Sequence, residues 1–467
     1  MYKKQHIHFV GIGGIGMSGI AHVLLELGYT VSGSDLREND ATRRLERLGG
    51  RIWRGHEAGH VKGADVVVVS SAVKEDNPEI QAAIEAGIPV IPRAEMLAGL
   101  MRLKKYGIAV AGAHGKTSTT SMTASVLRAG GLDPTMIIGG MVKAFGTNAC
   151  WGNGDFLVAE ADESDGSFLR LCPCIAVVTN IDREHLDHYR DLQDIQKAFV
   201  EFLERIPFYG ISILCGDDPI LASDVLPRLP GRVMTYGTRP CLDLTAQGIA
   251  FDGMRSSYTA YLRDRPIGEI RLRVPGIHHV RNSLAALAVG LELDIPFSSI
   301  QKGLADYEGV GRRFEVLGEP QGILVVDDYA HHPTEIKATL AAARGCWPDR
   351  RIIALFEPHR YTRTSALMEE FATAFADADE LWITEIYPAS ERPIVGVSGE
   401  RLARRIREVG NRPVHYAPTC QDLLYEASVS LAPGDVVFTL GAGSIGALGP
   451  KLISLLNQRE RATCVHP

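Results

Sequence analysis

The sequence predicts an α/β protein with parallel sheets in three domains, on the strength of two observations. Short apolar runs alternate with helical patterns along most of the chain, which is the rhythm of βαβ units and favours parallel sheets. With 467 residues the chain is about as long as three domains of ordinary size, and its 45% apolar content can supply several cores. We therefore expect an N-terminal domain over residues 1–105, a central domain over 106–310 and a C-terminal domain over 311–467.

The N-terminal domain begins with a glycine-rich turn after its first predicted strand. Strands are expected at 6–10, 30–33, 65–70 and 88–91, and helices at 16–27 and from 78. The turn contains Gly13, Gly14 and Gly16, and Asp35 closes the next strand. Glycines at this spacing let a backbone approach a pyrophosphate, and the acid can take a ribose hydroxyl, as in dinucleotide-binding turns. The same geometry serves other nucleoside diphosphates, so NAD(P), another diphosphate ligand and no ligand remain open interpretations.

A second loop of this domain, Ser70-Ser71-Ala72, follows another predicted parallel strand. Ligands of open α/β sheets usually lie at the carboxyl ends of the strands, so Ser70 and Ser71 are candidate ligand contacts. An ordinary polar strand end is the alternative interpretation.

The central domain opens with the most informative motif of the chain, AGAHGKTSTT over residues 111–120, between a strand at 107–110 and a helix beginning near Thr117. Backbone N–H groups of this turn would face phosphates, Lys116 would bring a positive charge to the β and γ oxygens, and the Thr117 hydroxyl would reach Mg²⁺. The loop is compressed, because Val110 stands where the full Walker pattern has glycine. A plain strand-to-helix turn is the alternative, but the motif favours the use of ATP.

Two further apolar strands of the central domain, at 156–161 and 174–180, run into acidic clusters. The first cluster includes Glu160, and the second includes His185. A carboxylate at such a strand end can hold Mg²⁺, so the clusters suggest a metal site with more than one ligand. Solvated or helix-capping acids, and a capping or surface role for His185, are the alternatives. Between 235 and 274, short alternating strands predict an antiparallel sheet attached to the ATPase core.

The C-terminal domain shows a third βα run, with strands at 323–326, 352–356, 380–384 and 436–440. Polar clusters at the ends of such strands contain Arg313, Asp328, Tyr329, His331, Arg360 and Arg363. Arginine forks bind carboxylates or phosphates through paired hydrogen bonds, so the clusters predict a site for an anionic group that faces the ATP. For any single cluster, a surface salt-bridge network is the alternative.

Composition excludes several classes of protein. The net charge of −7 comes without a basic tail, which argues against a general nucleic-acid binder. No signal-peptide pattern opens the chain, and no apolar run approaches the roughly 18 residues that a membrane span needs. We expect a cytoplasmic protein, monomeric or homodimeric, that does not bind membranes. The eight cysteines are scattered and fit no zinc or redox pattern, so we expect reduced, mostly buried thiols.

The chain resembles the Mur ligases over essentially its whole length, in motifs that occur in the family's order and spacing. These are GIGGIGMSGIA, AGAHGKTSTT, EADESD, TNIDREHLDHY, the H-x-x-x-N of His278 and Asn282, GRRFE, DDYAHHPTE and PHRYTRT. The compressed phosphate loop is itself the family's form. The resemblance implies a UDP-sugar-binding Rossmann-like N-terminal domain, a central P-loop ATPase domain with an added antiparallel sheet, and a Rossmann-like C-terminal domain that brings in an amino acid.

The resemblance also implies roles for individual residues. The implied nucleotide-binding residues are Gly112, His114, Gly115, Lys116, Thr117, Ser118, Asn282, Arg313 and Asp328. The implied metal ligands are Thr117, Glu160 and His185, and the implied catalytic residues are Lys116, His185, Arg313 and His331. The implied substrate-binding residues are Gly13, Gly14, Gly16, Asp35, Ser70, Ser71, Tyr329, His331, Arg360 and Arg363. Sister ligases carry a carbamylated lysine at the position of Val200, so we do not assign that modification to the nearby Lys197.

The motifs are most similar to those of family members that join L-alanine to the lactyl carboxylate of UDP-N-acetylmuramate. This implies a reaction with ATP and Mg²⁺, through an acyl phosphate, that yields UDP-N-acetylmuramoyl-L-alanine, ADP and phosphate in peptidoglycan precursor synthesis. A relative that attaches a preformed murein tripeptide shares most motifs but lacks the P-H-R-x-T-R cluster and the S-S-A loop that this chain has. A Rossmann oxidoreductase, which would leave the phosphate loop idle, and a nonenzymatic ATP switch are the alternatives from other classes.

Overall fold

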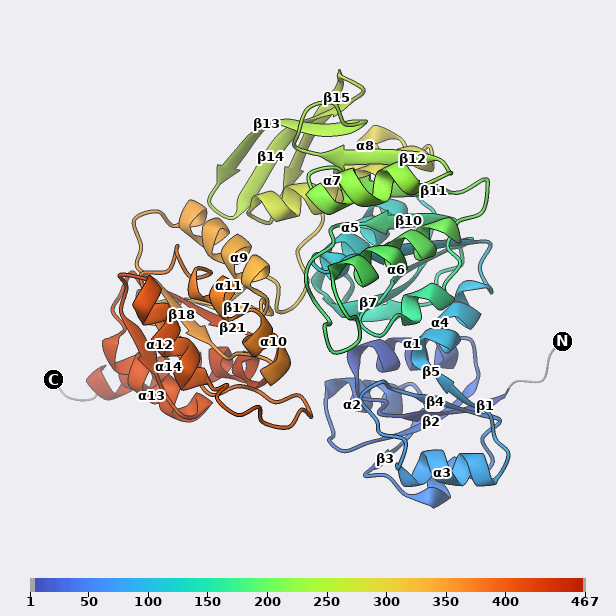
Figure 1. The fold of residues 1–467 in the computed structure, drawn as a ribbon, viewed down its shortest axis with the longest axis horizontal. Helices are drawn as coiled ribbons and strands as arrows, with labels where there is room; N and C mark the ends of the chain where they lie inside the picture. Colours follow the sequence, from blue (N-terminus) through green and yellow to red (C-terminus); the bar gives the residue numbers. More distant parts are fainter. Residues whose placement is uncertain (1–4, 465–467) are drawn as a thin grey trace.

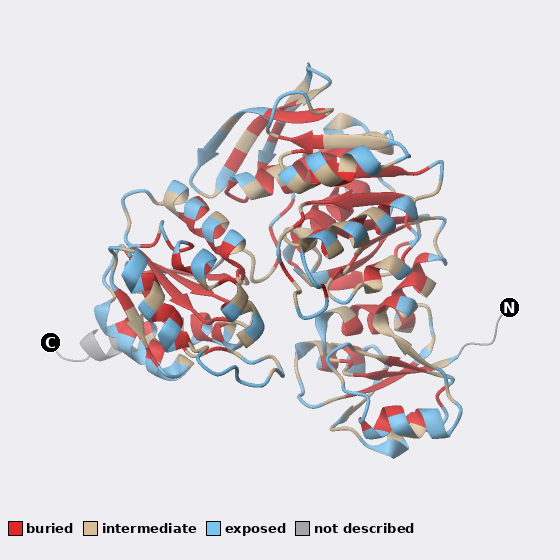
Figure 2. Ribbon diagram, in the orientation of Figure 1, coloured by how far each residue is buried: buried red, intermediate tan, exposed pale blue. Residues whose placement is uncertain are grey.

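The computed structural model describes residues 5–464, in three lobes that follow one another along the chain (Figure 1). Each lobe is built around its own sheet, with five, ten and six strands in chain order. The strands are mostly buried, and exposed residues gather on the outer faces of the helices (Figure 2). The three-domain α/β prediction is therefore confirmed.

The N-terminal sheet is parallel throughout, with the strand order β3-β2-β1-β4-β5. Its strands are β1 (His6–Val10), β2 (Thr30–Asp35), β3 (Arg51–Arg54), β4 (Val66–Val69) and β5 (Val90–Pro92), and its helices are α1 (Ile15–Glu26), α2 (Asp40–Arg47), α3 (Pro78–Glu85) and α4 (Arg93–Met101). Because β1 lies between β2 and β4, the glycine turn after β1 and the serine loop after β4 meet at one edge of the sheet. This edge is the switch point where such sheets bind ligands.

The central sheet has a parallel core and antiparallel additions, in the order β15-β14-β13-β12-β11-β10-β6-β9-β7-β8. The parallel core contains β6 (Tyr106–Ala111), β7 (Thr135–Val142), β9 (Phe156–Glu160), β10 (Ile175–Val178), β11 (Ile211–Cys215) and β12 (Val233–Gly237). The additions are β8 (Thr147–Cys150), β13 (Leu244–Asp252), β14 (Arg255–Leu262) and β15 (Arg265–Leu272). The antiparallel part was expected from residue 235, but β12 still pairs in parallel with β11, and antiparallel pairing on this side begins between β13 and β14.

Helix α5 (Lys116–Ala129) follows the phosphate loop and packs against α7 (Ile277–Glu292) and α8 (Phe297–Ala305). It is buried although it is rich in serine and threonine. The Thr120 and Ser121 hydroxyls donate to carbonyls one turn back, each at 2.8 Å, so some of its polar side chains find partners inside the helix. Helix α6 (Leu192–Glu204) follows β10 in the chain.

The C-terminal sheet has the order β16-β17-β21-β18-β19-β20 and is parallel except for β16 at one edge. Its strands are β16 (Glu315–Gly318), β17 (Leu324–Asp328), β18 (Ile352–Phe356), β19 (Glu380–Ile383), β20 (Val414–Tyr416) and β21 (Val436–Leu440). Its helices are α9 (Pro333–Cys346), α10 (Tyr361–Ala366), α11 (Met368–Ala372), α12 (Gly399–Val409), α13 (Cys420–Ser430) and α14 (Leu448–Cys464). Helix α9 faces the central lobe (Figure 1) and contacts α7.

The cysteine prediction needs a correction. All seven cysteines with described side chains are free, as expected, but only Cys215 among them is buried, and Cys172 and Cys241 are exposed. They lie in loops and at element ends rather than in strand interiors, which composition alone does not reveal. The side chain of Cys464 lies outside the described residues. Among residues 5–464, no helix is both long and apolar enough to cross a membrane.

Candidate functional site

The phosphate loop joins β6 to α5, and two of its glycines have left-handed backbones. Gly112 has a φ of +129° and Gly115 a φ of +81°. A Cβ on Gly112 would collide with the Thr179 hydroxyl, and one on Gly115 would press on the Asn282 side chain. Glycine is therefore required at both positions, as the sequence pattern predicts. The first N–H groups of α5 point out of this loop and have no partner within the helix.

Lys116 lies at the start of α5 and is held by an acid. Its Nζ donates to Glu163 Oε1 at 2.7 Å and to the Gly112 carbonyl at 2.6 Å. Burial lowers the pKa of Lys116, but the charges of Glu163 and Asp162 outweigh burial and raise it above its ordinary value. The phosphate loop therefore carries a fixed positive charge.

The three predicted metal ligands, Thr117, Glu160 and His185, all line one cavity of about 390 Å³. The Thr117 hydroxyl donates to Glu160 Oε2 at 3.2 Å, and the Gly139 N–H donates to Glu160 Oε1. Burial raises the pKa of Glu160, against the opposing effects of the Gly139 N–H and Lys116. Glu160 is half-buried, and its burial makes the carboxylate harder to ionise. A cation held by Glu160, the Thr117 hydroxyl and the His185 imidazole, which line the same cavity, would stabilise the charged form. This donor set fits Mg²⁺.

We call this cavity the reaction cavity, because all three lobes contribute to its wall. The N-terminal lobe contributes Gly14, Gly16, Ser70 and Arg93, the central lobe contributes Lys116, Thr117, Glu160, Asp162, Glu184 and His185, and the C-terminal lobe contributes Arg313, Tyr329, His331 and Glu335. The structure thus brings together the glycine turn, the phosphate loop and the C-terminal polar clusters. Arg93, which pairs with Asp162 at 2.8 Å, was not singled out from the sequence.

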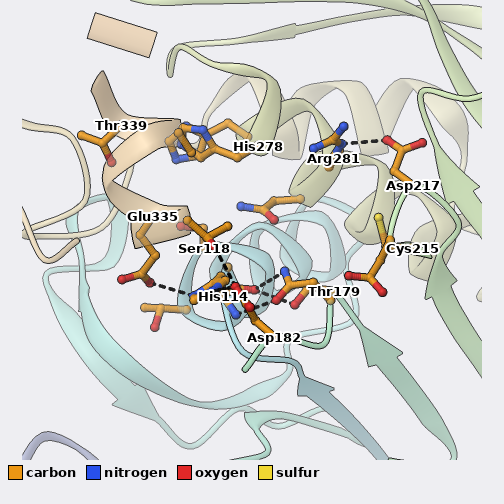
Figure 3. Close-up of a pocket in the computed structure, with 18 of the residues that line it drawn as sticks. His114, Ser118, Thr179, Asp182, Cys215, Asp217, His278, Arg281, Glu335 and Thr339 are labelled. Atoms are coloured by element: carbon orange, nitrogen blue, oxygen red, sulfur yellow. Dashed lines mark hydrogen bonds and ion pairs between the residues drawn. The ribbon is translucent and has the colours of Figure 1, made fainter. Parts of the chain in front are cut away.

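A second cavity of about 340 Å³ adjoins the phosphate loop, and we call it the nucleotide pocket (Figure 3). Seven of the nine predicted nucleotide-binding residues line it: His114, Gly115, Thr117, Ser118, Asn282, Arg313 and Asp328. Gly112 lines neither cavity, and Lys116 lines only the reaction cavity. Gly115, Thr117, Arg313 and Glu335 line both cavities. The two spaces therefore meet at the phosphate loop.

The nucleotide pocket contains a charged cluster that links two lobes. His114 Nε2 lies 2.9 Å from Asp182 Oδ2, and its Nδ1 lies 3.3 Å from Glu335 on α9. Burial lowers the pKa of His114, but the hydrogen bond to Asp182 and the charge of Glu335 outweigh burial and raise it to about 10. The Thr334 hydroxyl also donates to Asp182 Oδ2, at 2.7 Å. His114 is thus a cation beside the phosphate loop, and Asp182 ties the C-terminal lobe to the central one.

Asp328 lines the nucleotide pocket, but both its oxygens already have backbone partners. Its Oδ2 accepts from the Phe314 N–H and its Oδ1 from the Ala330 N–H, each at 2.7 Å. Burial raises its pKa to about 6, against the opposing charge of Arg313. In this structure Asp328 braces the loops around the pocket.

Some predicted substrate residues lie outside the reaction cavity. Asp35 Oδ2 accepts from the Gly13 N–H at 2.9 Å, so Asp35 fixes the shape of the glycine turn, and neither residue lines the cavity. Ser71 lines a different cavity of about 580 Å³ beside β4, together with Ser70. The N-terminal residues therefore spread over a surface wider than one cavity.

Arg360 and Arg363 line a small pocket of about 30 Å³, which we call the arginine pocket. Arg363 Nη2 donates to Glu184 Oε1 at 2.8 Å, and Arg360 Nη1 donates to Asp187 Oδ2 at 2.7 Å. Burial raises the pKa of Glu184, but the nearby His331 imidazole and the charge of Arg363 outweigh burial and hold that pKa well below its ordinary value. Both arginines therefore pair with acids of the central lobe.

The sequence analysis missed the acids that partner its predicted cations, above all Glu163, Glu184 and Glu335. Each belongs to a motif that was recognised and lies within four residues of a residue that was chosen. Glu163 pairs with Lys116, Glu184 with Arg363, and Glu335 lies 3.2 Å from His331 Nδ1. The available signal was their place at strand ends or at a helix start beside the predicted residues.

Models of Mur ligase domains match most of this chain. The Mur ligase family catalytic domain matches residues 6–105, the Mur ligase middle domain residues 110–290, and the glutamate ligase domain of Mur ligases residues 312–443.

Individual proteins are similar to the chain over nearly its full length. The UDP-N-acetylmuramate–L-alanine ligase of Pelobacter propionicus is 56% identical over 98% of this chain and 100% of that protein. The protein of the same name from Syntrophobacter fumaroxidans is 57% identical over 98% of this chain and 97% of its own length. Among solved structures, the UDP-N-acetylmuramate–alanine ligase of Thermotoga maritima has a TM-score of 0.84 at 29% identity, covering 97% of this chain and 100% of that one. A murein peptide ligase from Psychrobacter arcticus has a TM-score of 0.73 at 25% identity, covering 97% and 98%.

Proposed function

The chain belongs to the Mur ligase family, and we propose that its active site lies in the cavities between its lobes. Its activity is the ATP-dependent joining of L-alanine to UDP-N-acetylmuramate, and we propose that this reaction proceeds through an acyl phosphate. The reaction is a step of peptidoglycan precursor synthesis, and its products are UDP-N-acetylmuramoyl-L-alanine, ADP and phosphate. Because ATP and UDP-sugars are cytoplasmic metabolites, we place the reaction in the cytoplasm.

The composition of the reaction cavity carries this proposal. Its wall joins a glycine turn of the kind that binds diphosphates, a phosphate loop and a C-terminal cluster of histidine, tyrosine and arginine. The nucleotide pocket meets it at the phosphate loop, and the arginine pocket meets it at Glu184 and His185. Three substrates can therefore converge on one space, which a ligation in two steps requires.

The first step activates the lactyl carboxylate, which is otherwise a poor electrophile for an amine. A carboxylate oxygen attacks the γ-phosphorus of ATP, the bond to the β–γ bridging oxygen breaks, and ADP leaves. Lys116 and Arg313 line the cavity where this charge moves and would stabilise the transferring phosphoryl group. His114, a cation in the nucleotide pocket, would face the phosphates that remain on ADP.

The second step forms the amide. The neutral amine of L-alanine attacks the carbonyl carbon of the acyl phosphate, the carbon–oxygen bond to phosphate breaks, and phosphate leaves. Converting the alanine ammonium to an amide N–H releases two protons in all. Arg360 and Arg363 would hold the alanine carboxylate, and Tyr329 and His331 lie on the wall of the reaction cavity nearby.

We propose that Thr117, Glu160 and His185 hold Mg²⁺ during the reaction. Their oxygen and nitrogen donors line the same cavity, and Glu160 is the half-buried carboxylate described above. When bound, Mg²⁺ offsets negative charge on the phosphates during transfer. The contact between Thr117 and Glu160 supports placing both on one ion.

We also propose the domain boundaries after residues 105 and 310. Helix α4 ends at Met101 and β6 begins at Tyr106, while α8 ends at Ala305 and β16 begins at Glu315. Each boundary thus falls in a connection between elements of different sheets.

An isotope transfer experiment tests the acyl phosphate. UDP-N-acetylmuramate labelled with ¹⁸O in the lactyl carboxylate is incubated with ATP and L-alanine, and the released phosphate is analysed by mass spectrometry. Direct transfer through an acyl phosphate places one labelled oxygen in the phosphate. Unlabelled phosphate alongside normal product would contradict this mechanism.

A further inference from the structure

Glu184 is a buried carboxylate without an assigned role, and it is surrounded by basic side chains from two lobes. Its side chain is 5% exposed. Its Oε1 lies 2.8 Å from Arg363 Nη2 and 3.6 Å from His331 Nε2, both from the C-terminal lobe, and its Oε2 lies 3.6 Å from His185 Nε2 on its own loop. A carboxylate so enclosed is costly to leave without a positive partner.

The position of Glu184 joins the arginine pocket to the reaction cavity. Glu184 and His185 line both spaces, whereas Asp187 lines only the arginine pocket. An amino acid whose carboxylate lies on the arginines therefore has Glu184 between its carboxylate site and the reaction cavity. The amine must face that cavity in order to attack.

The charges in the arginine pocket are balanced by the protein itself. Arg363 pairs with Glu184, and Arg360 pairs with Asp187. A substrate carboxylate that binds Arg363 must compete with Glu184 for that guanidinium. Once displaced, Glu184 would be a buried anion lacking its closest partner. The substrate that displaces it carries an ammonium group two bonds from its carboxylate carbon.

We propose that Glu184 binds the α-ammonium of the incoming amino acid and, before the amino acid arrives, holds Arg363 in the position that receives its carboxylate. The inference rests on the proposed function, since it places the amino acid in the arginine pocket. In this arrangement Glu184 pairs first with Arg363 and then with the substrate ammonium. The buried negative charge of Glu184 therefore always has a positive partner. This arrangement also makes the ammonium group, and not the carboxylate alone, a requirement for binding.

The test compares L-alanine with propionate, which has the carboxylate and the methyl group but no ammonium. In Glu184→Gln the Michaelis constant for alanine should rise about ten- to hundredfold, because a charged hydrogen bond is lost. Propionate, measured as an inhibitor competitive with alanine, should bind equally well or more tightly, because its carboxylate no longer competes with Glu184. The Michaelis constants for ATP and UDP-N-acetylmuramate should stay near those of the wild type.

Two further variants separate this role from a structural one. Asp187→Asn removes the acid that pairs with Arg360 in the same pocket. This variant should still bind alanine in preference to propionate, as the wild-type enzyme does. Glu184→Asp keeps the charge and should recover part of that preference, which also covers the case that the glutamine variant does not fold.

The inference is overturned if Glu184→Gln leaves the Michaelis constant for alanine unchanged, or if it weakens the binding of alanine and of propionate by the same factor. It is equally overturned if Asp187→Asn abolishes the preference for alanine to the same degree. Failure of the proposed function would look different, because the wild-type enzyme would then form no amide from alanine.

Discussion

Lys116 Nζ lies 2.7 Å from Oε1 of Glu163, a carboxylate whose other oxygen is buried and has no hydrogen-bond partner among the described residues. Glu163, which follows β9 and lines neither cavity, is thus the counter-anion of the phosphate-loop lysine. Glu163 neutralises Lys116 in the free protein and must yield part of that contact when a nucleotide binds. Lys116 is therefore held by a charge interaction, and the catalytic role that we propose for it can be tested by removing that charge.

Replacing Lys116 by Ala is expected to reduce the rate of ligation by more than about a hundredfold, because loss of one donor to transferring charge costs roughly 3 kcal/mol. The variant should also lose some stability, because Glu163 is left buried without its cation. The double variant Lys116→Ala with Glu163→Gln should recover stability but not activity. Steady-state rates and thermal denaturation measure both effects, with the exposed Lys302→Ala as control. Near-normal turnover in Lys116→Ala would show that Lys116 of the phosphate loop does not take part in the reaction.

Replacing Arg360 or Arg363 by Ala should raise the Michaelis constant for alanine far more than those for ATP or the UDP-sugar. Charged hydrogen bonds are worth roughly 1.5–3 kcal/mol each, so about a ten- to hundredfold change is expected. Replacement by Lys should restore little, since a point charge cannot reproduce the planar fork. Arg404→Ala, exposed on α12, is the control. Unchanged alanine dependence in both variants, or efficient use of a murein tripeptide as acceptor, would favour the tripeptide ligase instead.

The glycine turn of the N-terminal lobe should bind UDP-N-acetylmuramate and not NAD(H). We expect micromolar or tighter affinity for the UDP-sugar in calorimetric titration, with no competition from NAD(H). Asp35→Ala should weaken this binding, because Asp35 accepts from the Gly13 N–H at 2.9 Å and shapes the turn. Tight binding of NAD(H) would reverse the assignment of this lobe.

Glu79 should make the stability of the N-terminal lobe depend on pH. It is fully buried, and burial raises its pKa, but hydrogen bonds from His8, Ser34 and His60 outweigh burial and lower that pKa to about 2. Because the folded-state pKa lies below the ordinary value of 4.5, this stabilisation is complete above about pH 4.5 and is lost as the pH falls toward 2. Glu79→Gln should therefore lower the free energy of unfolding by about 1–3 kcal/mol at pH 7, and by less as the pH falls.

Fluorescence of Trp53 can report this unfolding, because its ring stacks on His60 with centroids 4.6 Å apart. The other tryptophans, Trp151, Trp347 and Trp382, are replaced by Phe in both proteins that are compared. The measured quantity is the difference in the free energy of unfolding between the protein with Glu79 and its Glu79→Gln variant. If this difference grows as the pH falls, the sign of the prediction is wrong.

The sequence predicted those parts of the site that depend on local patterns. The glycine turn, the phosphate loop and the acidic strand ends each follow an apolar strand, so a short motif and its context identify them. It could not predict which acid faces which cation. Lys116 and Glu163 are 47 residues apart in the chain, and Glu184 and Arg363 are 179 apart, so these pairs depend on how the sheets and lobes are arranged.

The missed elements of the fold have a similar cause. Strand β3 lies at a sheet edge and carries Arg51 and Arg54 at its ends, so it lacks the long apolar run that marked its neighbours. Strand β12 was assigned to the antiparallel part because its alternation resembles that of β13 and β14. Its parallel pairing with β11 is set by the path of the intervening chain, which periodicity does not record.

Release of phosphate with each substrate omitted in turn tests the central claim most directly. The account predicts rapid, sustained release only when ATP, UDP-N-acetylmuramate and L-alanine are all present, with one amide formed for each phosphate. Omitting the UDP-sugar should abolish release, because no carboxylate is then available to take the γ-phosphoryl group. Omitting alanine should leave at most slow release, from hydrolysis of the acyl phosphate. Sustained release from ATP that is independent of the UDP-sugar, or no coupling between phosphate and amide, would contradict it.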